Sequence, residues 1–266
     1  MTQSPGVLFE RLVDIMSRLR GPDGCPWDRE QTRHTLKPYL LEEAYEVLEA
    51  IEAGAPAAIE EELGDLLFQV VFHAHLGSEL NEFTITSVLQ RLIDKMVERH
   101  PHVFGDARAT TAAEVLVQWE AIKQREAARA GRTRSVIDGV PRALPALLRA
   151  QRLQSKAARV NFDWPDAGAA WSKVEEEIEE ARGALASGDR ARLEDELGDV
   201  LFSVVNVARL SSIDAEEAMR GAIDKFRRRF TEMEDDLSAR GKSVGNVSQE
   251  ELEQSWSAVK AQERGR

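Results

Sequence analysis

The sequence has almost no cysteine, no long apolar run and no excess of positive charge, and each of these absences excludes a class of protein. A single cysteine, Cys25, rules out an internal disulfide, so a reducing cytoplasm is the expected compartment. Because no stretch of about 18 apolar residues occurs, and the first residues lack the basic segment of a signal peptide, we expect no membrane span and no secretion signal. The net charge of −12 repels a nucleic-acid backbone, so binding to DNA or RNA is not expected.

Length and charge together limit what the chain can bind. With 266 residues, of which 42% are hydrophobic, the chain is long enough for two domains of about 130 residues each. A small anionic substrate would also be repelled by the net charge. Its binding therefore requires a metal ion and a local group of lysine and arginine side chains.

An internal repeat is the most informative feature of the sequence. Residues 40–76 and 174–210 align without a gap, 134 positions apart. Both segments contain Glu-Glu-x-x-Glu, a turn, Glu-Leu-Gly-Asp and an apolar run. Further matches follow in the same order: Asp94-Lys95 with Asp224-Lys225, Arg99 with Arg229, Trp119 with Trp256, and Lys123 with Lys260.

Both halves have the apolar periodicity of helices. Apolar residues recur every three or four positions in 40–51 and in 63–74, and no segment alternates as a strand does. Helices joined by short turns pack antiparallel, so each half is expected to be a helical bundle. The sequence thus predicts an all-α protein of two tandem helical modules, residues 1–126 and 146–266. The segment between them, residues 127–145, is rich in Gly, Pro and Arg and is read as a linker.

Four acidic residues per half are placed so that they can meet. Glu43 and Glu46 are three residues apart in the first expected helix, as are Glu62 and Asp65 in the second, so each pair shares a helix face. Folding the two helices antiparallel brings the four carboxylates together. Their counterparts in the second half have the same spacing: Glu177, Glu180, Glu196 and Asp199.

A divalent cation explains this grouping. Carboxylates at the edge of a core repel one another and resist removal from water, and a hard cation relieves both effects. Mg²⁺ prefers carboxylate oxygen and keeps several waters, which leaves positions for phosphate; Mn²⁺ could substitute for it. Two alternatives remain open at this point. The acids could form a solvated helix face, or they could hold two irons, although that chemistry usually takes Glu-x-x-His pairs, which both motifs lack.

A glycine precedes the aspartate in both halves. Gly64 and Gly198 are in helix interiors, where glycine costs about 1 kcal/mol relative to alanine. Their presence indicates the close approach of either a ligand or a neighbouring helix, and the sequence does not distinguish the two.

At these residues the sequence resembles the MazG family of all-α nucleotide pyrophosphohydrolases. The resemblance rests on GPDGCPWDREQT (21–32), LLEEAYEVLEAI (40–51), EELGDLLFQVVF (61–72), DKMVERHPHVF (94–104), SVIDGVPRALPALLRAQRLQ (135–154), FDW (162–164), EDELGDVLF (194–202) and the final Trp-x-x-x-Lys. It implies hydrolysis of NTPs and dNTPs to the monophosphate and pyrophosphate, with Mg²⁺ held by the acids named above. It also implies an oligomer, commonly a dimer, and a role in removing non-standard or excess nucleotides; we expect a homodimer at least.

Basic residues near the second set of acids are expected to hold the triphosphate. Lys173 and Arg192 each precede a glutamate of that set by one helical turn. Each could alternatively form a surface salt bridge. The other residues expected to bind the nucleotide are Lys225 and Arg229, which form a second cationic pair, Trp256, whose ring can stack on a base or pack in the core, and Lys260.

The two halves differ in these cations. Lys173 aligns with Tyr39, and Arg192 aligns with Ala58, so the N-terminal half lacks two of the expected phosphate contacts. We therefore expect the C-terminal half to carry most of the turnover, and the N-terminal half to be weaker or to have a different substrate. The alternative is that the nearby Lys37 or Arg33 compensates for the missing cations. A non-catalytic helical interaction module is the rival hypothesis, but a scaffold has no need for eight carboxylates at such spacing.

Overall fold

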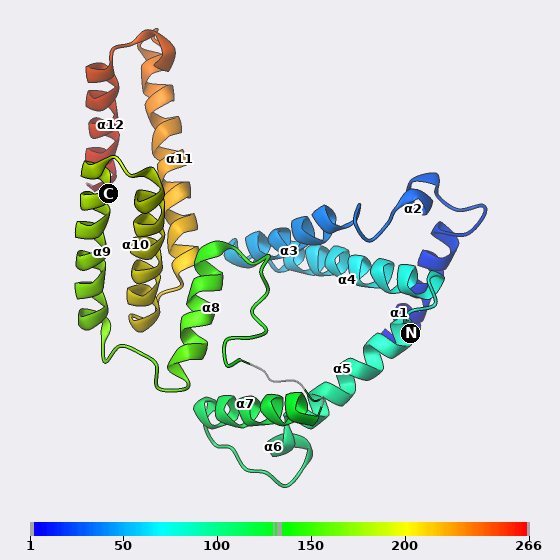
Figure 1. The fold of residues 1–266 in the computed structure, drawn as a ribbon. Helices are drawn as coiled ribbons and strands as arrows, with labels where there is room; N and C mark the ends of the chain where they lie inside the picture. Colours follow the sequence, from blue (N-terminus) through cyan, green and yellow to red (C-terminus); the bar gives the residue numbers. More distant parts are fainter. Residues whose placement is uncertain (1–2, 130, 132–134, 265–266) are drawn as a thin grey trace. The chain divides into compact units, whose positions relative to one another are not determined.

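The computed structural model describes residues 3–129, 131 and 135–264, and the chain separates into two compact units (Figure 1). Unit 1 is Met1–Ala130 and unit 2 is Gly131–Arg266, so the division falls inside the expected linker. The last helix of unit 1 continues to Arg129, and the first three residues of that linker are therefore helical. Each unit is described by itself below.

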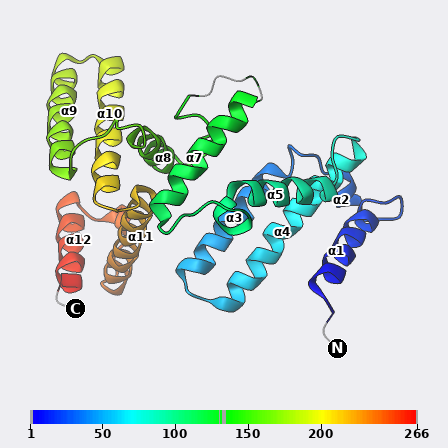
Figure 2. The same cartoon turned by 90° about the horizontal axis from the view of Figure 1, so that it is seen from below.

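Unit 1 is built around a pair of long helices, α3 and α4, that run side by side (Figure 2). Helices α1 and α5 pack on α4, and α5 also contacts α6 and α7. The helices are α1 (Pro5–Leu19), α2 (Pro26–Glu30), α3 (Lys37–Glu52), α4 (Pro56–Glu79), α5 (Ile85–Arg99), α6 (Pro101–Phe104) and α7 (Ala112–Arg129).

Unit 2 repeats the paired arrangement with α9 and α10, against which α8 packs, and adds a second pair, α11 and α12. Its elements are α8 (Ala146–Ala158), α9 (Ala167–Ser187), α10 (Arg190–Leu210), α11 (Ala215–Ala239), the short 3₁₀ helix η1 (Val244–Asn246) and α12 (Gln249–Arg264). No strand occurs in the described part of the chain. The prediction of an all-α protein with two tandem helical modules is confirmed.

The turns that form the two hairpins follow from local sequence. In unit 2, Gly188 ends α9 with φ of 72°, and the Asp189 side chain accepts a hydrogen bond from the Arg192 N–H at the start of α10. In unit 1, Gly54 adopts φ of 61°, and Pro56 begins α4. A glycine with positive φ therefore follows the first helix of the hairpin in both halves, but the second helix begins with a proline in unit 1 and with an aspartate N-cap in unit 2.

The core of unit 1 lies between α1 and α4. Met16 is completely buried there against Phe72, which is 1% exposed. The Arg20 side chain fastens the loop after α1 to the far end of α4, because its guanidinium bonds both Glu79 oxygens at 2.8 Å and lies over the Phe72 ring. Helix α2 follows this loop and carries Trp27, whose ring lies edge-on to Tyr39 with centroids 5.7 Å apart. The aromatic pair is thereby held one turn before Glu43.

The core of unit 2 includes a cluster between α11 and α12. Met233, Leu237 and Val259 are buried in it, and Trp256 packs against its edge. Among the described helices of both units, none is both long and apolar enough to cross a membrane.

Candidate metal centre

The α9–α10 hairpin brings three carboxylates of unit 2 together. Glu177 comes from α9, and Glu196 and Asp199 come from α10. Their oxygens all lie within 4.8 Å of one another. Glu177 is 5% exposed and is one of the few buried charged side chains, whereas Asp199 is open to solvent. These three residues are called the C-terminal acidic cluster. A cation bound between them would be open to water or substrate on the side of Asp199.

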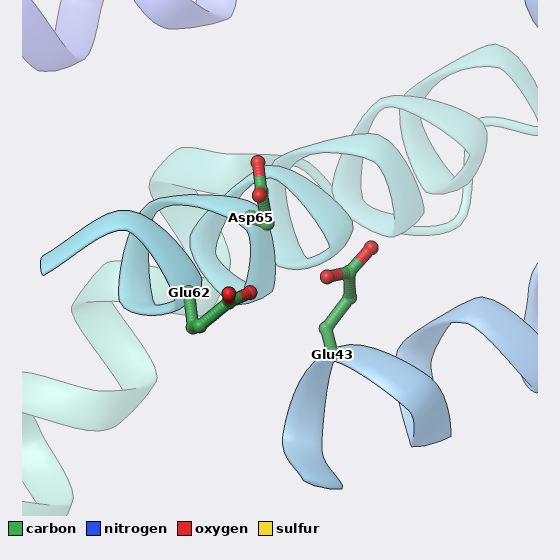
Figure 3. Close-up of side chains that lie close together, drawn as sticks. All are labelled: Glu43, Glu62 and Asp65. Carbon is green, nitrogen blue, oxygen red and sulfur yellow. The ribbon is translucent and has the colours of Figure 1, made fainter. Parts of the chain in front are cut away.

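The α3–α4 hairpin builds the matching group in unit 1. Figure 3 shows Glu43 on α3 facing Glu62 and Asp65 on α4 across the gap between the helices. Oxygens of these three residues, the N-terminal acidic cluster, also lie within 4.8 Å of one another. The two clusters use equivalent positions of the repeat, so the predicted convergence of the acids occurs for three residues in each half.

The fourth predicted acid lies beside each cluster. Repulsion from Glu196, followed by removal from water, raises the pKa of Glu180. In unit 1, removal from water raises the pKa of both Glu43 and Glu62, and the charge of Glu46 adds to each shift. Glu180 and Glu46 are therefore within reach of the clusters but are not among their three closest members.

Electrostatics within the clusters favour a cation. Removal from water is the main cause of the raised pKa of Asp199, and the charges of Glu177 and Asp195 add to it. Removal from water also has the largest effect on the pKa of Glu43, with Asp65 next. Crowding makes it harder for these carboxyls to lose their protons. A divalent cation between them stabilises the ionised carboxylates and offsets this effect. The donor set, oxygen alone, suits Mg²⁺ or Mn²⁺.

Two of the predicted phosphate-binding cations lie at the C-terminal acidic cluster. Lys173 bonds Glu176 at 2.6 Å and Glu177 at 2.8 Å, and these contacts raise the pKa of the Lys173 ammonium above its usual value. The Arg192 Nε lies 3.2 Å from a Glu196 oxygen. Both cations are thus positioned at the cluster, and each is paired with one of its carboxylates.

The other predicted substrate residues lie on α11 and α12. Arg229 is bound to Glu263 of α12, with Nε 2.7 Å from the carboxylate, and Lys225, one turn earlier, is exposed. The Trp256 ring packs at 5.5 Å from the ring of Phe226, and Lys260 is half-buried one turn further along α12. None of these four contacts the acidic cluster in the described hydrogen bonds and ion pairs.

The equivalent residues of unit 1 repeat this pattern. Arg99 bonds Glu126 at 2.8 Å, as Arg229 bonds Glu263. Trp119 packs edge-on to His100, with ring centroids 5.2 Å apart. At the acids themselves, however, unit 1 has Tyr39 in place of Lys173 and Ala58 in place of Arg192.

The structure addresses the two glycines and the histidines as well. A Cβ built on Gly64 or Gly198 meets nothing within 4 Å among the described residues, so no neighbouring helix of the chain requires either glycine. No histidine of the described residues belongs to either acidic cluster, and the imidazole of His75 instead lies 3.4 Å from Glu79. The alternative of a di-iron centre therefore gains no support.

Two neighbours of the clusters did not emerge from the sequence. The buried Gln69 lies one turn after Asp65, and its amide approaches Glu43 at 3.5 Å. The spacing of four residues from Asp65 could have indicated that Gln69 lies on the same helix face. The second half has Ser203 at the equivalent position, so comparison of the two halves did not point to this residue. Asp195 contributes to the raised pKa of Asp199. Its position four residues before Asp199, on the same helix face, could have indicated this.

Comparison with known proteins places this arrangement in a family. The model of the MazG nucleotide pyrophosphohydrolase domain matches twice, over residues 31–104 and 169–233, and each match contains one acidic cluster. A protein of Escherichia coli (strain K12) named nucleoside triphosphate pyrophosphohydrolase is 48% identical over 260 residues, which cover 96% of this chain and 98% of the relative.

A second relative, from Thermotoga maritima, is named nucleoside triphosphate pyrophosphohydrolase/pyrophosphatase MazG. It is 44% identical over 255 residues, which cover 96% of each chain. With a duplicated family match and relatives aligned from end to end, the chain belongs to the MazG nucleotide pyrophosphohydrolase family.

Proposed function

We propose that the protein hydrolyses nucleoside and deoxynucleoside triphosphates to the monophosphate and pyrophosphate, and that the reaction requires Mg²⁺. The observation that carries this proposal is the acidic cluster, in which oxygens of Glu177, Glu196 and Asp199 lie within 4.8 Å of one another. The names of the relatives from Escherichia coli and Thermotoga maritima support the same reaction.

The chemistry of the cluster matches this reaction. Mg²⁺ would neutralise phosphate charge and lower the pKa of a bound water. Lys173 and Arg192, which now pair with the carboxylates, would be released toward phosphate oxygens once a metal ion takes over the carboxylates. The chain's own residues thus supply both the metal ligands and the cations that an acidic protein needs for a triphosphate. Lys225, Arg229, Trp256 and Lys260 are proposed to complete the nucleotide site.

We further propose that the functional form is a homodimer. Two separate compact domains of half this mass would together expose about 14,000 Å², whereas this chain exposes 18853 Å². Much of the excess is apolar: Leu197 and Leu201 of α10 are 50% and 52% exposed, and Ile223 and Phe226 of α11 are 57% and 58% exposed. A second copy covering these faces would remove the excess from water.

The two halves are proposed to contribute unequally. Each charge-assisted contact to phosphate is worth roughly 1.5–3 kcal/mol, so the loss of two contacts in unit 1 would separate the sites by about a hundredfold or more. Accordingly, most of the turnover is assigned to Glu177, Glu180, Glu196 and Asp199. Broad base specificity, a role in clearing unwanted nucleotides and a cytoplasmic location complete the proposal, with no nucleic-acid substrate.

One assay tests the reaction and a pair of variants tests its location. The protein is incubated with GTP, with and without Mg²⁺, and the products are separated. GMP and pyrophosphate are expected, and only with the metal; GDP and orthophosphate, or no turnover, would contradict the proposal. Glu180→Ala is expected to abolish most of the activity and Glu46→Ala to leave most of it. The reverse result would assign the turnover to unit 1.

A further inference from the structure

Unit 1 contains a pocket whose lining includes none of the acids described above. Its volume is ≈ 360 Å³, and it lies between the end of α5, α6, the loop 105–111 and α7. Pro101, Ala107 and Ile122 supply apolar lining, and Gln118 and Arg125 are among the polar residues. This volume is at the lower end of the range for small-molecule sites. The α5–α7 pocket, as it is called here, therefore suits a small ligand.

The matching region of unit 2 is filled by its own chain. Helix α5 ends at Arg99, whereas α11 continues well past the matching Arg229. Leu237, in the added part of α11, is completely buried in one core cluster with Val259. Val259 matches Ile122, which instead lines the pocket. The α5–α7 pocket thus corresponds to space that the longer α11 fills in unit 2.

One buried acceptor of the pocket is unused. The Gln118 amide nitrogen donates to the Arg108 carbonyl at 2.8 Å, and this bond fixes the orientation of the amide. Its Oε1 is buried and has no hydrogen-bond partner among the described residues. The matching Ser255 of unit 2 is also buried, but its hydroxyl donates to Asp236 at 3.0 Å. A buried acceptor without a partner is unfavourable, so a ligand that donates a hydrogen bond to Gln118 would be stabilised there.

A cation without a carboxylate partner lies on the same helix. Arg125 is exposed, lines the pocket and forms no ion pair within the described part of the chain. Its Nε donates to the Ala121 carbonyl at 3.3 Å, so the side chain leans back along α7 toward Gln118. Gln118 precedes Ala121 by three residues, or about 4.5 Å along the helix axis. A carboxylate bound to Arg125 would therefore place a neighbouring amine within reach of Gln118 Oε1.

The other charged residues of the lining have partners of opposite charge. A Glu98 oxygen lies 3.5 Å from the Arg129 guanidinium, and Glu126 bonds Arg99 at 2.8 Å. Among the described lining residues, Arg125 is therefore the cation left to attract an anionic group. One such cation suits a single carboxylate, whereas a triphosphate would need several positive charges.

We propose that the α5–α7 pocket binds a free amino acid with a branched aliphatic side chain, such as leucine or valine. The carboxylate would bind the Arg125 guanidinium, and the ammonium group would donate to Gln118 Oε1. The aliphatic side chain would pack against Pro101, Ala107 and Ile122. The site does not depend on the hydrolysis proposed above and would bind its ligand without a metal ion.

Arg125→Gln tests the proposal by giving unit 1 the residue that unit 2 has at the matching position, Gln262. The full chain is titrated calorimetrically with leucine, valine, leucinamide and 4-methylpentanoate, without divalent metal. Leucine or valine is expected to bind with a Kd below about 1 mM. Leucinamide lacks the carboxylate and 4-methylpentanoate lacks the amine, so each should bind at least about tenfold more weakly than leucine. Arg125→Gln should weaken the binding of leucine by at least about tenfold.

Two further variants keep the result decisive. Ala107→Leu fills part of the pocket from an exposed loop position and leaves both polar contacts in place, so it should also weaken the binding of leucine. Arg18→Gln is the matched control, because Arg18 is exposed on α1 and the substitution removes the same charge outside the pocket. It should bind leucine as tightly as the parent chain does. All three variants should keep the melting temperature of the parent chain.

Several outcomes would overturn the proposal. They are the absence of binding by both leucine and valine, binding of leucinamide or 4-methylpentanoate as tight as that of leucine, and undiminished binding in both Arg125→Gln and Ala107→Leu. A fourth is a loss of binding in Arg18→Gln as large as that in Arg125→Gln, which would indicate a general effect of charge. The hydrolysis of GTP is measured separately, so failure of either proposal would be recognised without the other.

Discussion

Replacement of Gly198 by alanine should stabilise α10 and reduce turnover at the same time. The residue lies inside α10, and a Cβ at this position meets nothing within 4 Å in the described chain. Without a steric penalty, the substitution gains the helix propensity of alanine, about 1 kcal/mol in the free energy of unfolding. For a unit of this size that corresponds to a rise in Tm of roughly 3–5 °C.

Activity should fall because the open space beside Gly198 borders the proposed metal centre at Asp199. Gly198 lines an open hollow of ≈ 590 Å³ together with Arg192, Asp195 and Asp199. An added methyl group would intrude where the metal, its waters or the phosphates must fit. A loss in kcat/KM of about tenfold, or 1.4 kcal/mol in transition-state binding, is expected.

The assay compares pyrophosphate release and thermal unfolding for matched glycine variants. Gly221→Ala is the control for helix propensity, since Gly221 also lies inside a helix with open space at its Cβ position. It should raise Tm and leave kcat/KM unchanged. Gly64→Ala makes the same change in unit 1 and should affect activity little. Full activity of Gly198→Ala would refute the reasoning, and a lowered Tm would show that another chain approaches the glycine.

Three further predictions concern stability, metal binding and assembly. Glu79→Gln should lower the free energy of unfolding by about 1–2 kcal/mol at neutral pH, because it breaks charged hydrogen bonds to Arg20. The Arg20 side chain is 8% exposed, but the Glu79 side chain is 37% exposed, so solvent partly screens the interaction. The Arg20 hydrogen bonds lower the pKa of Glu79. Ionised Glu79 therefore stabilises the fold fully above the ordinary pKa of 4.5, and this stabilisation is lost as the pH falls through the lowered pKa. Urea unfolding should show that the parent chain and Glu79→Gln become more similar in stability below pH 4.5. Mg²⁺ should raise the Tm of the parent chain, and Glu177→Gln should reduce that rise as measured by calorimetry; an equal rise in both proteins would place the metal elsewhere. Ile223→Glu should shift the mass in light scattering toward the monomer, and a monomeric parent chain would contradict the proposed dimer.

The fold and the acids could be predicted because their signals are local. The helical period of 40–51 and the three-residue spacing of Glu62 and Asp65 are fixed by the geometry of one helix. The length of the turn at Gly188 then determines that two such helices lie side by side. Convergence of the acids follows from these short-range features, and the repeat states the same pattern twice.

Partners that are distant in the sequence could not be predicted in this way. Arg229 matched the expected nucleotide site by its spacing from Lys225, yet its carboxylate partner, Glu263, is 34 residues away on another helix. The Arg209–Asp163 pair spans 46 residues.

The hairpins that carry the acids are closed by their own backbone and packing. Gly188 and the Asp189 cap set the turn, and α9 packs along α10. Binding of the proposed metal is therefore expected to be separate from folding, in contrast to small domains whose chains assemble only around their ions. A chelator is then expected to remove the metal, and added metal to restore it, without unfolding of the chain. The concentration of free divalent cation would then control the rate of the proposed reaction quickly and reversibly, while the amount of folded protein stays the same.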